Sequence, residues 1–209
     1  MRKLFMLGAV LAVMAIPTAS HAGGFTLGLR LGYAGPVGDG AKDQPMSDVV
    51  AGAIPFQVDG LYRVTPQIAV GGYLSYGFGM LNSDLSDSCD AAGIDCSVSQ
   101  TRIGIEGTYT FTQVSGKFVP WAGLGIGYEW LTQEMSVSGL SASQDAGGWE
   151  YANLQVGGDY MFSKLFGLGP YVTYSFGQYN NVEGSDIPEK AMHSWWNIGV
   201  RGKFDFGAK

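Results

Sequence analysis

The sequence predicts an all-β protein, an eight-stranded antiparallel up-and-down transmembrane β-barrel. Eight segments alternate bulky apolar residues with small or polar ones, the charges and many of the 33 glycines fall on the second set, and long connections alternate with short ones. The aromatic content of 13% and charged content of 14% argue against disorder. With a net charge of -6 and a pI near 4.7, the chain lacks the basic surface of a nucleic-acid binder, so we expect no nucleic-acid partner.

The first residues have the pattern of an export signal. Arg2 and Lys3 precede an apolar run over residues 4–16, and small residues flank His21 before the expected cleavage after Ala22. The run is too short to cross about 30 Å of hydrocarbon as a helix. We therefore expect residues 1–22 to be a cleaved signal peptide and residues 23–209 to form one barrel domain.

Alternation defines the strands, because successive side chains of a strand point to opposite faces. In the first, Phe25, Leu27, Leu29, Leu31 and Tyr33 share one face, and the same period recurs seven more times. Prolines fall near the expected strand ends or in a turn, where a missing amide donor is tolerated. The expected strands are 25–33, 54–64, 68–78, 103–111, 122–130, 152–162, 172–176 and 196–206.

The direction of the two faces distinguishes a membrane barrel from a soluble β-protein. A soluble sandwich or lipocalin would place the bulky apolar face in its core and the polar face in water. Glycines on the polar face favour the reverse arrangement, because a crowded lumen needs small residues and a solvated surface does not. We then expect ten charged residues to form ion-pair networks inside the barrel: Arg30, Asp59, Arg63, Arg102, Glu106, Glu129, Asp159, Arg201, Lys203 and Asp205.

The connections have two length classes. Long intervals are expected over 35–52, 80–100, 131–148 and 178–194, and short ones near 65–67, 112–117 and 163–169. Long external loops and short periplasmic turns are typical of outer-membrane barrels. Four long and three short connections place both termini of an eight-stranded barrel at the periplasmic end.

Aromatic residues gather toward the expected strand ends, as in the girdles at membrane interfaces. We expect Tyr62, Phe111, Trp130, Trp149, Trp195, Trp196 and Phe206 to form such a girdle.

Cys89 and Cys96 are the two cysteines, and both fall in one long loop of an exported chain. An oxidising compartment favours a disulfide between them. A metal site would need more ligands than two thiols, and acidic loop residues are better explained as a solvated rim than as a calcium site. We expect neither a metal nor a cofactor.

Two segments resemble a known family. Residues 119–128, VPWAGLGIGY, are similar to the glycine-rich strand of the small outer-membrane β-barrels of Gram-negative bacteria, the OmpA/OmpX-like and opacity-type proteins, and residues 198–206 resemble their closing strand. OmpW-like proteins share the glycine-rich strand. The resemblance implies insertion by the barrel-assembly machinery and contact with outer-membrane lipid and lipopolysaccharide. The family's last strand normally ends the chain on phenylalanine, whereas three residues follow Phe206 here.

The sequence leaves three functions to compare. We expect a monomeric structural scaffold that presents acidic, disulfide-stiffened loops to an unknown extracellular ligand. The alternative is a narrow porin-like conduit for small solutes through the charged lumen. The third, a lipid A-modifying enzyme, is disfavoured because neighbouring residues of a strand face opposite sides, so His193 and Ser194 make a poor base and nucleophile unless the strand begins after them. We therefore expect no enzymatic activity.

Overall fold

The computed structural model describes residues 23–111, 116–137 and 140–207. The expected signal peptide, residues 1–22, lies outside the described residues. None of the helices in the described part of the chain is both long enough and apolar enough to cross a membrane.

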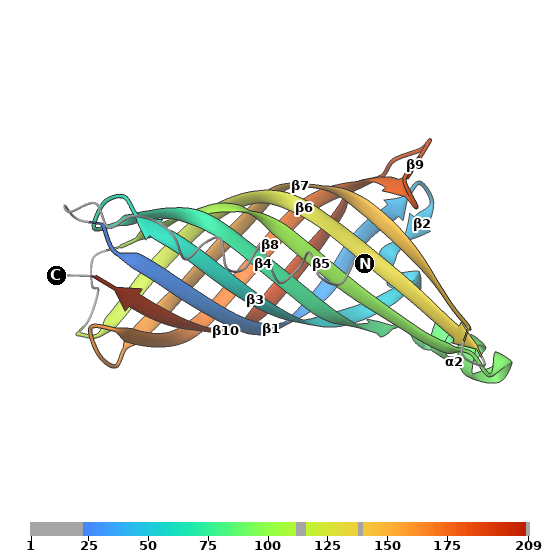
Figure 1. Cartoon of the computed structure of the whole chain (residues 1–209), viewed down its shortest axis with the longest axis horizontal. Helices are drawn as coiled ribbons and strands as arrows, with labels where there is room; N and C mark the ends of the chain where they lie inside the picture. The colour runs from blue at the N-terminus through green and yellow to red at the C-terminus, as the bar shows by residue number, and fades with distance from the viewer. Residues whose placement is uncertain (1–22, 112–115, 138–139, 208–209) are drawn as a thin grey trace.

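Eight long antiparallel strands close into a barrel within the described residues (Figure 1). Consecutive strands pair with each other, and β1 pairs with β10 from Phe25↔Phe206 to Gly38↔His193, which closes the sheet. The short strands β2 (Gln44–Pro45) and β9 (Ser185–Asp186) lie outside the barrel wall. The long strands are β1 (Phe25–Ala41), β3 (Val50–Arg63), β4 (Ile68–Leu81), β5 (Asp95–Thr110), β6 (Phe118–Val137), β7 (Leu140–Met161), β8 (Phe166–Val182) and β10 (His193–Phe206).

The two ends of the barrel differ. At one end, called the turn end, short connections join β3 to β4, β5 to β6 and β7 to β8, and the first and last described residues lie there too (Figure 1). Hydroxyls close two of these turns: Thr65 Oγ1 accepts from the amide of Ile68 at 2.9 Å, and Ser163 Oγ from that of Phe166 at 3.0 Å. The opposite end, called the loop end, carries β2, β9, the 3-10 helix η2 (Met46–Asp48) and the helix α2 (Ser83–Ala92).

Part of the loop prediction is wrong. Residues 131–148 were expected as a loop, but β6 extends to Val137 and β7 begins at Leu140, and these parts of the two strands, which are 20 and 22 residues long, pair as a hairpin. A tilted transmembrane strand needs only about 9–11 residues, so this hairpin projects well beyond a bilayer. The expected loop over 80–100 instead contains α2. Asn82 caps the start of this helix, because its side chain accepts from the amide of Asp84 at 2.9 Å. The helix ends at Gly93, which has a φ of 66°.

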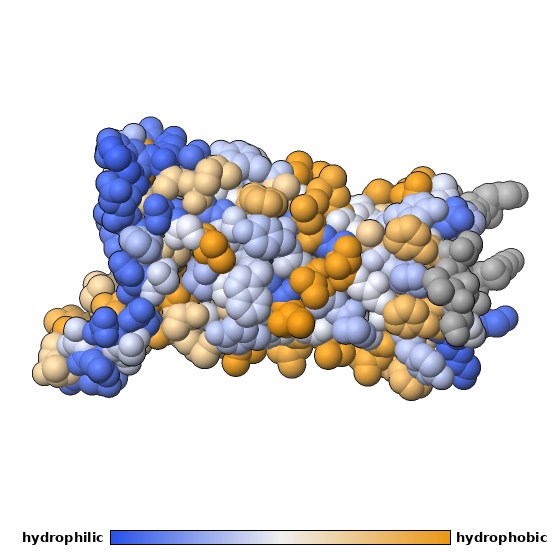
Figure 2. Space-filling model, turned by 180° about the vertical axis from the view of Figure 1, so that it is seen from behind, coloured by the Kyte–Doolittle hydropathy of each residue, from blue (hydrophilic) through white to orange (hydrophobic). Residues whose placement is uncertain are grey.

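The outer wall of the barrel is apolar and its interior is polar. Apolar side chains cover the wall, and hydrophilic surface gathers mainly at the ends (Figure 2). Leu31, Ile105 and Val156 are each more than half exposed, whereas Arg30, Asp59 and Glu129 are buried. Charged residues are almost never buried in the core of a water-soluble protein unless paired, and a continuous apolar exterior is unstable in water. The chain is therefore an eight-stranded transmembrane β-barrel with its polar face inward.

Candidate functional site

The buried charged side chains of the described part of the chain lie in the lumen of the barrel. Among the described residues it contains five basic side chains and six carboxylates, which include all ten of the residues expected there and Glu150 in addition. Both signs are distributed along the barrel axis, so every charge has an opposite charge within reach.

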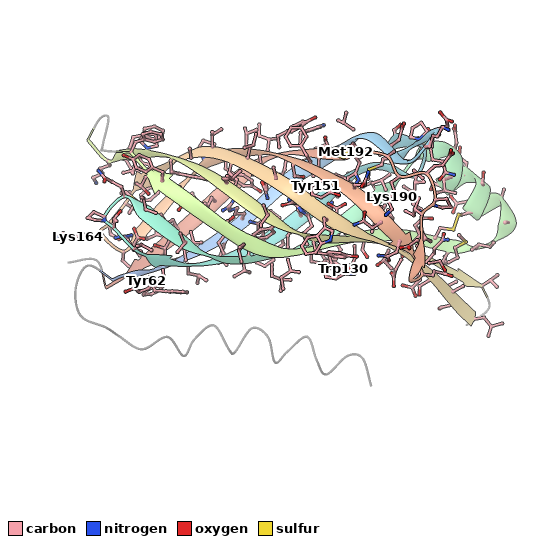
Figure 3. The ribbon with its side chains drawn as sticks, turned by 90° about the horizontal axis from the view of Figure 1, so that it is seen from above. Tyr62, Trp130, Tyr151, Lys164, Lys190 and Met192 are labelled. Carbon is pink, nitrogen blue, oxygen red and sulfur yellow. A yellow bond between two sulfur atoms is a disulfide. The ribbon has the colours of Figure 1, made fainter. Side chains whose placement is uncertain are left out.

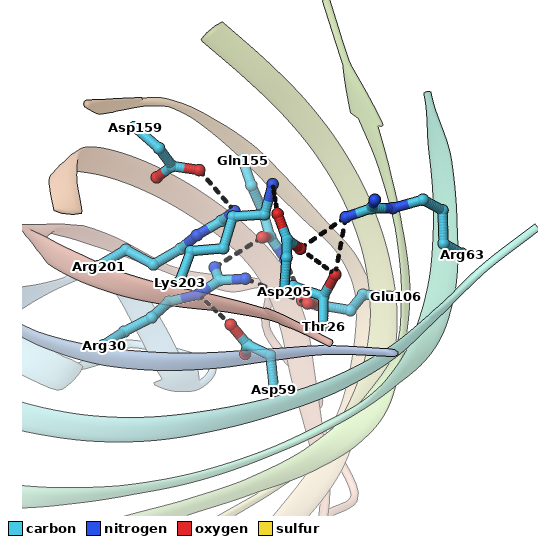
Figure 4. A network of polar contacts seen from close by, with 10 residues as sticks. All are labelled: Thr26, Arg30, Asp59, Arg63, Glu106, Gln155, Asp159, Arg201, Lys203 and Asp205. Carbon is cyan, nitrogen blue, oxygen red and sulfur yellow. Dashed lines mark hydrogen bonds and ion pairs between the residues drawn. The ribbon is translucent and has the colours of Figure 1, made fainter. Parts of the chain in front are cut away.

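Arg30 is the centre of the largest network (Figure 4). Its Nε donates to Asp59 Oδ2 at 2.6 Å, its Nη1 to Gln155 Oε1 at 2.6 Å and its Nη2 to Glu106 Oε1 at 3.1 Å. Gln155 in turn donates to Glu106 at 2.7 Å, and Gln57 donates to Asp59 at 2.7 Å. These bonds connect β1, β3, β5 and β7 across the lumen.

A second group lies closer to the turn end (Figure 4). Asp205 accepts from Arg63 Nη2 at 2.6 Å and from Thr26 Oγ1 at 2.7 Å, and its other oxygen is 3.1 Å from Lys203 Nζ. Arg201 donates to Asp159 at 2.9 Å. The turn-end mouth of the lumen is thus closed by paired charges, with Arg63 the most exposed of them.

The third group lies toward the loop end. Arg102 bonds to Glu150, whose other oxygen accepts from the Tyr73 hydroxyl at 2.6 Å. Glu129 accepts from the Tyr179 hydroxyl and from Trp195 Nε1, the latter at 3.0 Å, and lies 3.3 Å from His193 Nε2. Arg102 reaches within 4.0 Å of Glu129 and so connects the two carboxylates.

Aromatic rings fill the space between these groups. Arg201 lies 3.9 Å over the Trp121 ring and Arg30 lies 5.4 Å from it, both within the range of a cation–π contact. The glycines of the same face make room for these rings, since a Cβ at Gly104 would lie 2.7 Å from Tyr73 Cε1. Ion pairs and rings together fill an interior that an eight-stranded barrel leaves just wide enough for side chains.

Glu150 was missed from the sequence because a β-bulge changes the alternation of β7. Between Glu150 and Ala152, β7 contains one more residue than β6 and β8. The extra residue lets Trp149 and Tyr151 face outward while Glu150 and Asn153 both face inward. Alternation counted back from Leu154 would place Glu150 in lipid.

One member of the expected aromatic girdle is placed wrongly. Trp195 is only 1% exposed, and its indole lies in the lumen against Glu129. Its neighbour Trp196 faces outward and packs against Tyr33 at 5.5 Å. The strand predicted over 196–206 begins after Trp195, whereas β10 begins at His193, so the alternation that places Trp195 inward starts before the predicted strand. The other expected positions lie on the outer wall, half-buried for Tyr62 and exposed for Phe111, Trp130, Trp149, Trp196 and Phe206.

The loop end is acidic, and the turn end is not. Among the described residues, all twelve carboxylates outside the lumen belong to the loop end: Asp39, Asp43, Asp48, Asp84, Asp87, Asp90, Asp95, Glu134, Asp145, Glu183, Asp186 and Glu189. Its basic residues in that part of the chain are Lys42 and Lys190, whereas Lys117 and Lys164 lie at the turn end. Lys190 and Lys164 are seen at the two ends in Figure 3.

A disulfide between Cys89 and Cys96 fixes α2 to the start of β5 (Figure 3). Cys89 is buried, while the acidic residues of the helix are exposed. Within the described residues no group of three or more His, Cys, Asp or Glu side chains is arranged to hold a metal ion.

His193 and Ser194 do not form a catalytic pair. The His193 ring stacks on Tyr179 with centroids 4.1 Å apart and contacts Glu129, inside the barrel. Ser194 is half-buried on the opposite, outward face of β10. A serine nucleophile requires its base within hydrogen-bond distance, which this arrangement does not provide.

No protein-family model and no curated protein sequence matches the chain. Solved structures do match it. A major outer membrane protein from Thermus thermophilus is 11% identical with a TM-score of 0.58, covering 89% of this chain and all of its own. OprG from Pseudomonas aeruginosa is 14% identical with a TM-score of 0.51, covering 88% of this chain and 96% of its own. Neisserial surface protein A is 12% identical with a TM-score of 0.50, covering 87% and 96%. The chain therefore has the fold of the small β-barrels found among outer-membrane proteins.

Proposed function

We propose that the protein is a rigid, closed outer-membrane scaffold that presents its acidic, disulfide-stiffened loop end at the cell surface. The observation that carries the proposal is the separation of charge: the lumen charges are paired with one another, and the remaining described carboxylates all lie at the loop end. A transport path would need a lumen that is not blocked by these ion pairs, whereas a scaffold gains rigidity from them.

The rigidity of the loop end supports the proposal that this end presents a binding surface to a partner outside the cell. The β6–β7 hairpin continues the barrel wall outward, the disulfide holds α2, and β2 pairs with β1. Elements that are already ordered lose little conformational entropy when a partner binds. A surface held in this way is suited to contact with a partner outside the cell. The proposal includes a monomer surrounded by outer-membrane lipid and lipopolysaccharide, inserted by the barrel-assembly machinery.

Orientation can be tested on intact cells. Ser143→Cys places a thiol on the exposed β7 part of the loop-end hairpin, and Lys164→Cys places one in the turn between β7 and β8. A membrane-impermeant maleimide should label the first variant on intact cells and the second only after the outer membrane is permeabilised. The opposite pattern would contradict a surface-exposed loop end. The native cysteines serve as an internal control, since their disulfide leaves no thiol to react.

Whether the lumen is closed to ions can be tested by planar-bilayer conductance of the refolded protein. The proposal predicts no steady openings for the wild-type barrel. Openings that are stable and change when Arg102 or Glu106 is replaced by an uncharged residue would favour the conduit instead, because both side chains lie in the blocked part of the lumen.

A further inference from the structure

A pocket of about 660 Å³ opens at the loop end of the barrel. Its size lies within the range of small-molecule binding sites, about 300–1,000 Å³. Apolar side chains supply much of its wall, and they come from η2 and the residue after it, from β6, β7 and β8, and from the segment after β9: Met46, Val49, Leu131, Ala146, Val182 and Ile187. The pocket is therefore an apolar recess in an acidic and otherwise hydrophilic end of the molecule.

The floor of the pocket is closed. Tyr179 lines it, donates its hydroxyl to Glu129 and stacks on His193, and Trp195 fills the next position toward the barrel centre. Tyr179 and Trp195 belong to one buried cluster with Met46 and Leu131. Below it lie the ion pairs of Arg102 and Arg30. A molecule that enters from the loop end meets a blind recess rather than a passage.

The rim is held in place by contacts between segments far apart in the chain. Ala41 bridges to Lys190, and the Lys42 amide donates to the carbonyl of Glu189 at 3.1 Å. Lys42 Nζ also lies 2.9 Å from Glu189 Oε1. The pocket is thus already formed, with one wall from β2 and the 187–189 segment and the other from the β6–β7 hairpin.

The charge at the rim selects the sign of a ligand. Among the described residues, three charged side chains line the pocket, Lys42, Asp186 and Glu189. Lys42 and Glu189 pair with each other, which leaves the Asp186 carboxylate with no ion-pair or side-chain hydrogen-bond partner among the described residues. The surrounding loop end carries twelve described carboxylates against two lysines, and such a field attracts cations.

We propose that this loop-end pocket binds a small cationic amphiphile, with an alkyl or aryl group against Met46, Leu131 and Ile187 and an ammonium group near Asp186. Burial of the apolar group supplies the binding energy, and the rim carboxylates supply the preference for a positive charge. Because the floor is closed, the ligand binds at the loop end and does not pass through the barrel.

Methyl NMR in lipid nanodiscs tests the proposal without a solubilising detergent, so that the added probes, kept below their micellar concentrations, are the amphiphiles offered to the pocket. The full mature chain is labelled with ¹³C-methyl methionine and titrated with decyltrimethylammonium, decanol and decanoate, which share one alkyl chain. Met46 lines the pocket, and Met161, at the turn end, reports on nonspecific partition into the lipid. We expect a saturable shift of Met46 with no saturable shift of Met161, and tighter binding of the ammonium than of the carboxylate by about threefold.

Two variants separate the apolar and the charged parts of the site. Ala146→Phe fills the recess and should abolish saturable binding of all three probes, while Asp186→Asn should reduce only the preference for the ammonium. Ile187→Ser, on the half-buried rim, replaces Ala146→Phe if that chain fails to fold by heat-modifiable gel migration. Equal or tighter binding of decanoate, a Met46 response no different from that of Met161, or unchanged binding in a folded Ala146→Phe barrel would overturn the proposal.

Discussion

Arg30 Nε donates to Asp59 Oδ2 at 2.6 Å, and both side chains are only 1% exposed. The pair joins the neighbouring strands β1 and β3, and the same guanidinium reaches Glu106 on β5 and Gln155 on β7. One arginine therefore ties four strands of the barrel together from the inside. Isolated charges at this depth would be costly, so each member of the network depends on the others.

Removal of Arg30 should destabilise the barrel strongly. Arg30→Met leaves two buried carboxylates without their principal partner, and breaking a buried pair in this way costs about 3–5 kcal/mol of unfolding free energy. The matched control is Lys42→Met, since Lys42 and Glu189 form an exposed pair, for which a loss below about 1 kcal/mol is expected. Urea unfolding of both variants in lipid vesicles measures the difference. Equal stability of the two variants would show that the lumen network does not hold the barrel together.

A Gly→Ala substitution in the lumen should lower stability only where a ring or the backbone of another residue occupies the place of the new Cβ. At Gly157 a Cβ would lie 2.8 Å from the carbonyl oxygen of Pro170 and would also contact the Trp121 ring. Gly157→Ala should cost about 1–3 kcal/mol, as overpacking of a filled interior does. Gly77→Ala is the control, because Gly77 also faces inward and the nearest neighbour of its Cβ would be 3.5 Å away. Unfolding of both in the same lipid tests this, and a Gly157→Ala barrel as stable as the Gly77→Ala barrel would argue against a packed lumen.

Loss of the disulfide should loosen the loop end and spare the barrel. In the double variant Cys89→Ser and Cys96→Ser, α2 is no longer tied covalently to β5. Because the segment then opens locally more often, we expect an aspartate-specific protease to cut within residues 83–95 several-fold faster than in the wild type. Heat-modifiable gel migration should be unchanged, because none of the strand pairings involves the sulfur atoms. Unaltered cleavage would mean that the loop is ordered by other contacts.

Much of the barrel could be predicted from the sequence because the environment of a membrane β-strand repeats with a period of two residues. Leu27, Leu29 and Leu31 on one face and Arg30 on the other specify a strand and its orientation without knowledge of any partner. The ion-pair partners could not be predicted in the same way. Arg30 and Gln155 are 125 positions apart, and their contact depends on the stagger of eight strands, which alternation does not determine.

The errors have local physical causes. At Tyr151 and Ala152 a bulge shifts the alternation by one residue, so Glu150 could not be assigned to the lumen by counting. The 131–148 interval carries polar residues on both faces, since it lies beyond the apolar band, and a hairpin there lacks the pattern of a membrane strand. Trp195 has the residue type of an interfacial anchor, but β10 begins three residues before the predicted strand and its alternation places Trp195 inward.

Trp195 and Trp196 provide the most direct test of the orientation of the two faces, because they are adjacent in one strand and face opposite sides of the wall. Single-tryptophan variants that retain one or the other, with the remaining tryptophans replaced by phenylalanine, are refolded into vesicles whose lipids carry bromine near the headgroup end of the acyl chains. The account predicts strong quenching of Trp196 fluorescence and little quenching of Trp195. Quenching of Trp195 as strong as that of Trp196, or an unquenched Trp196, would contradict a polar lumen enclosed by a lipid-facing apolar wall.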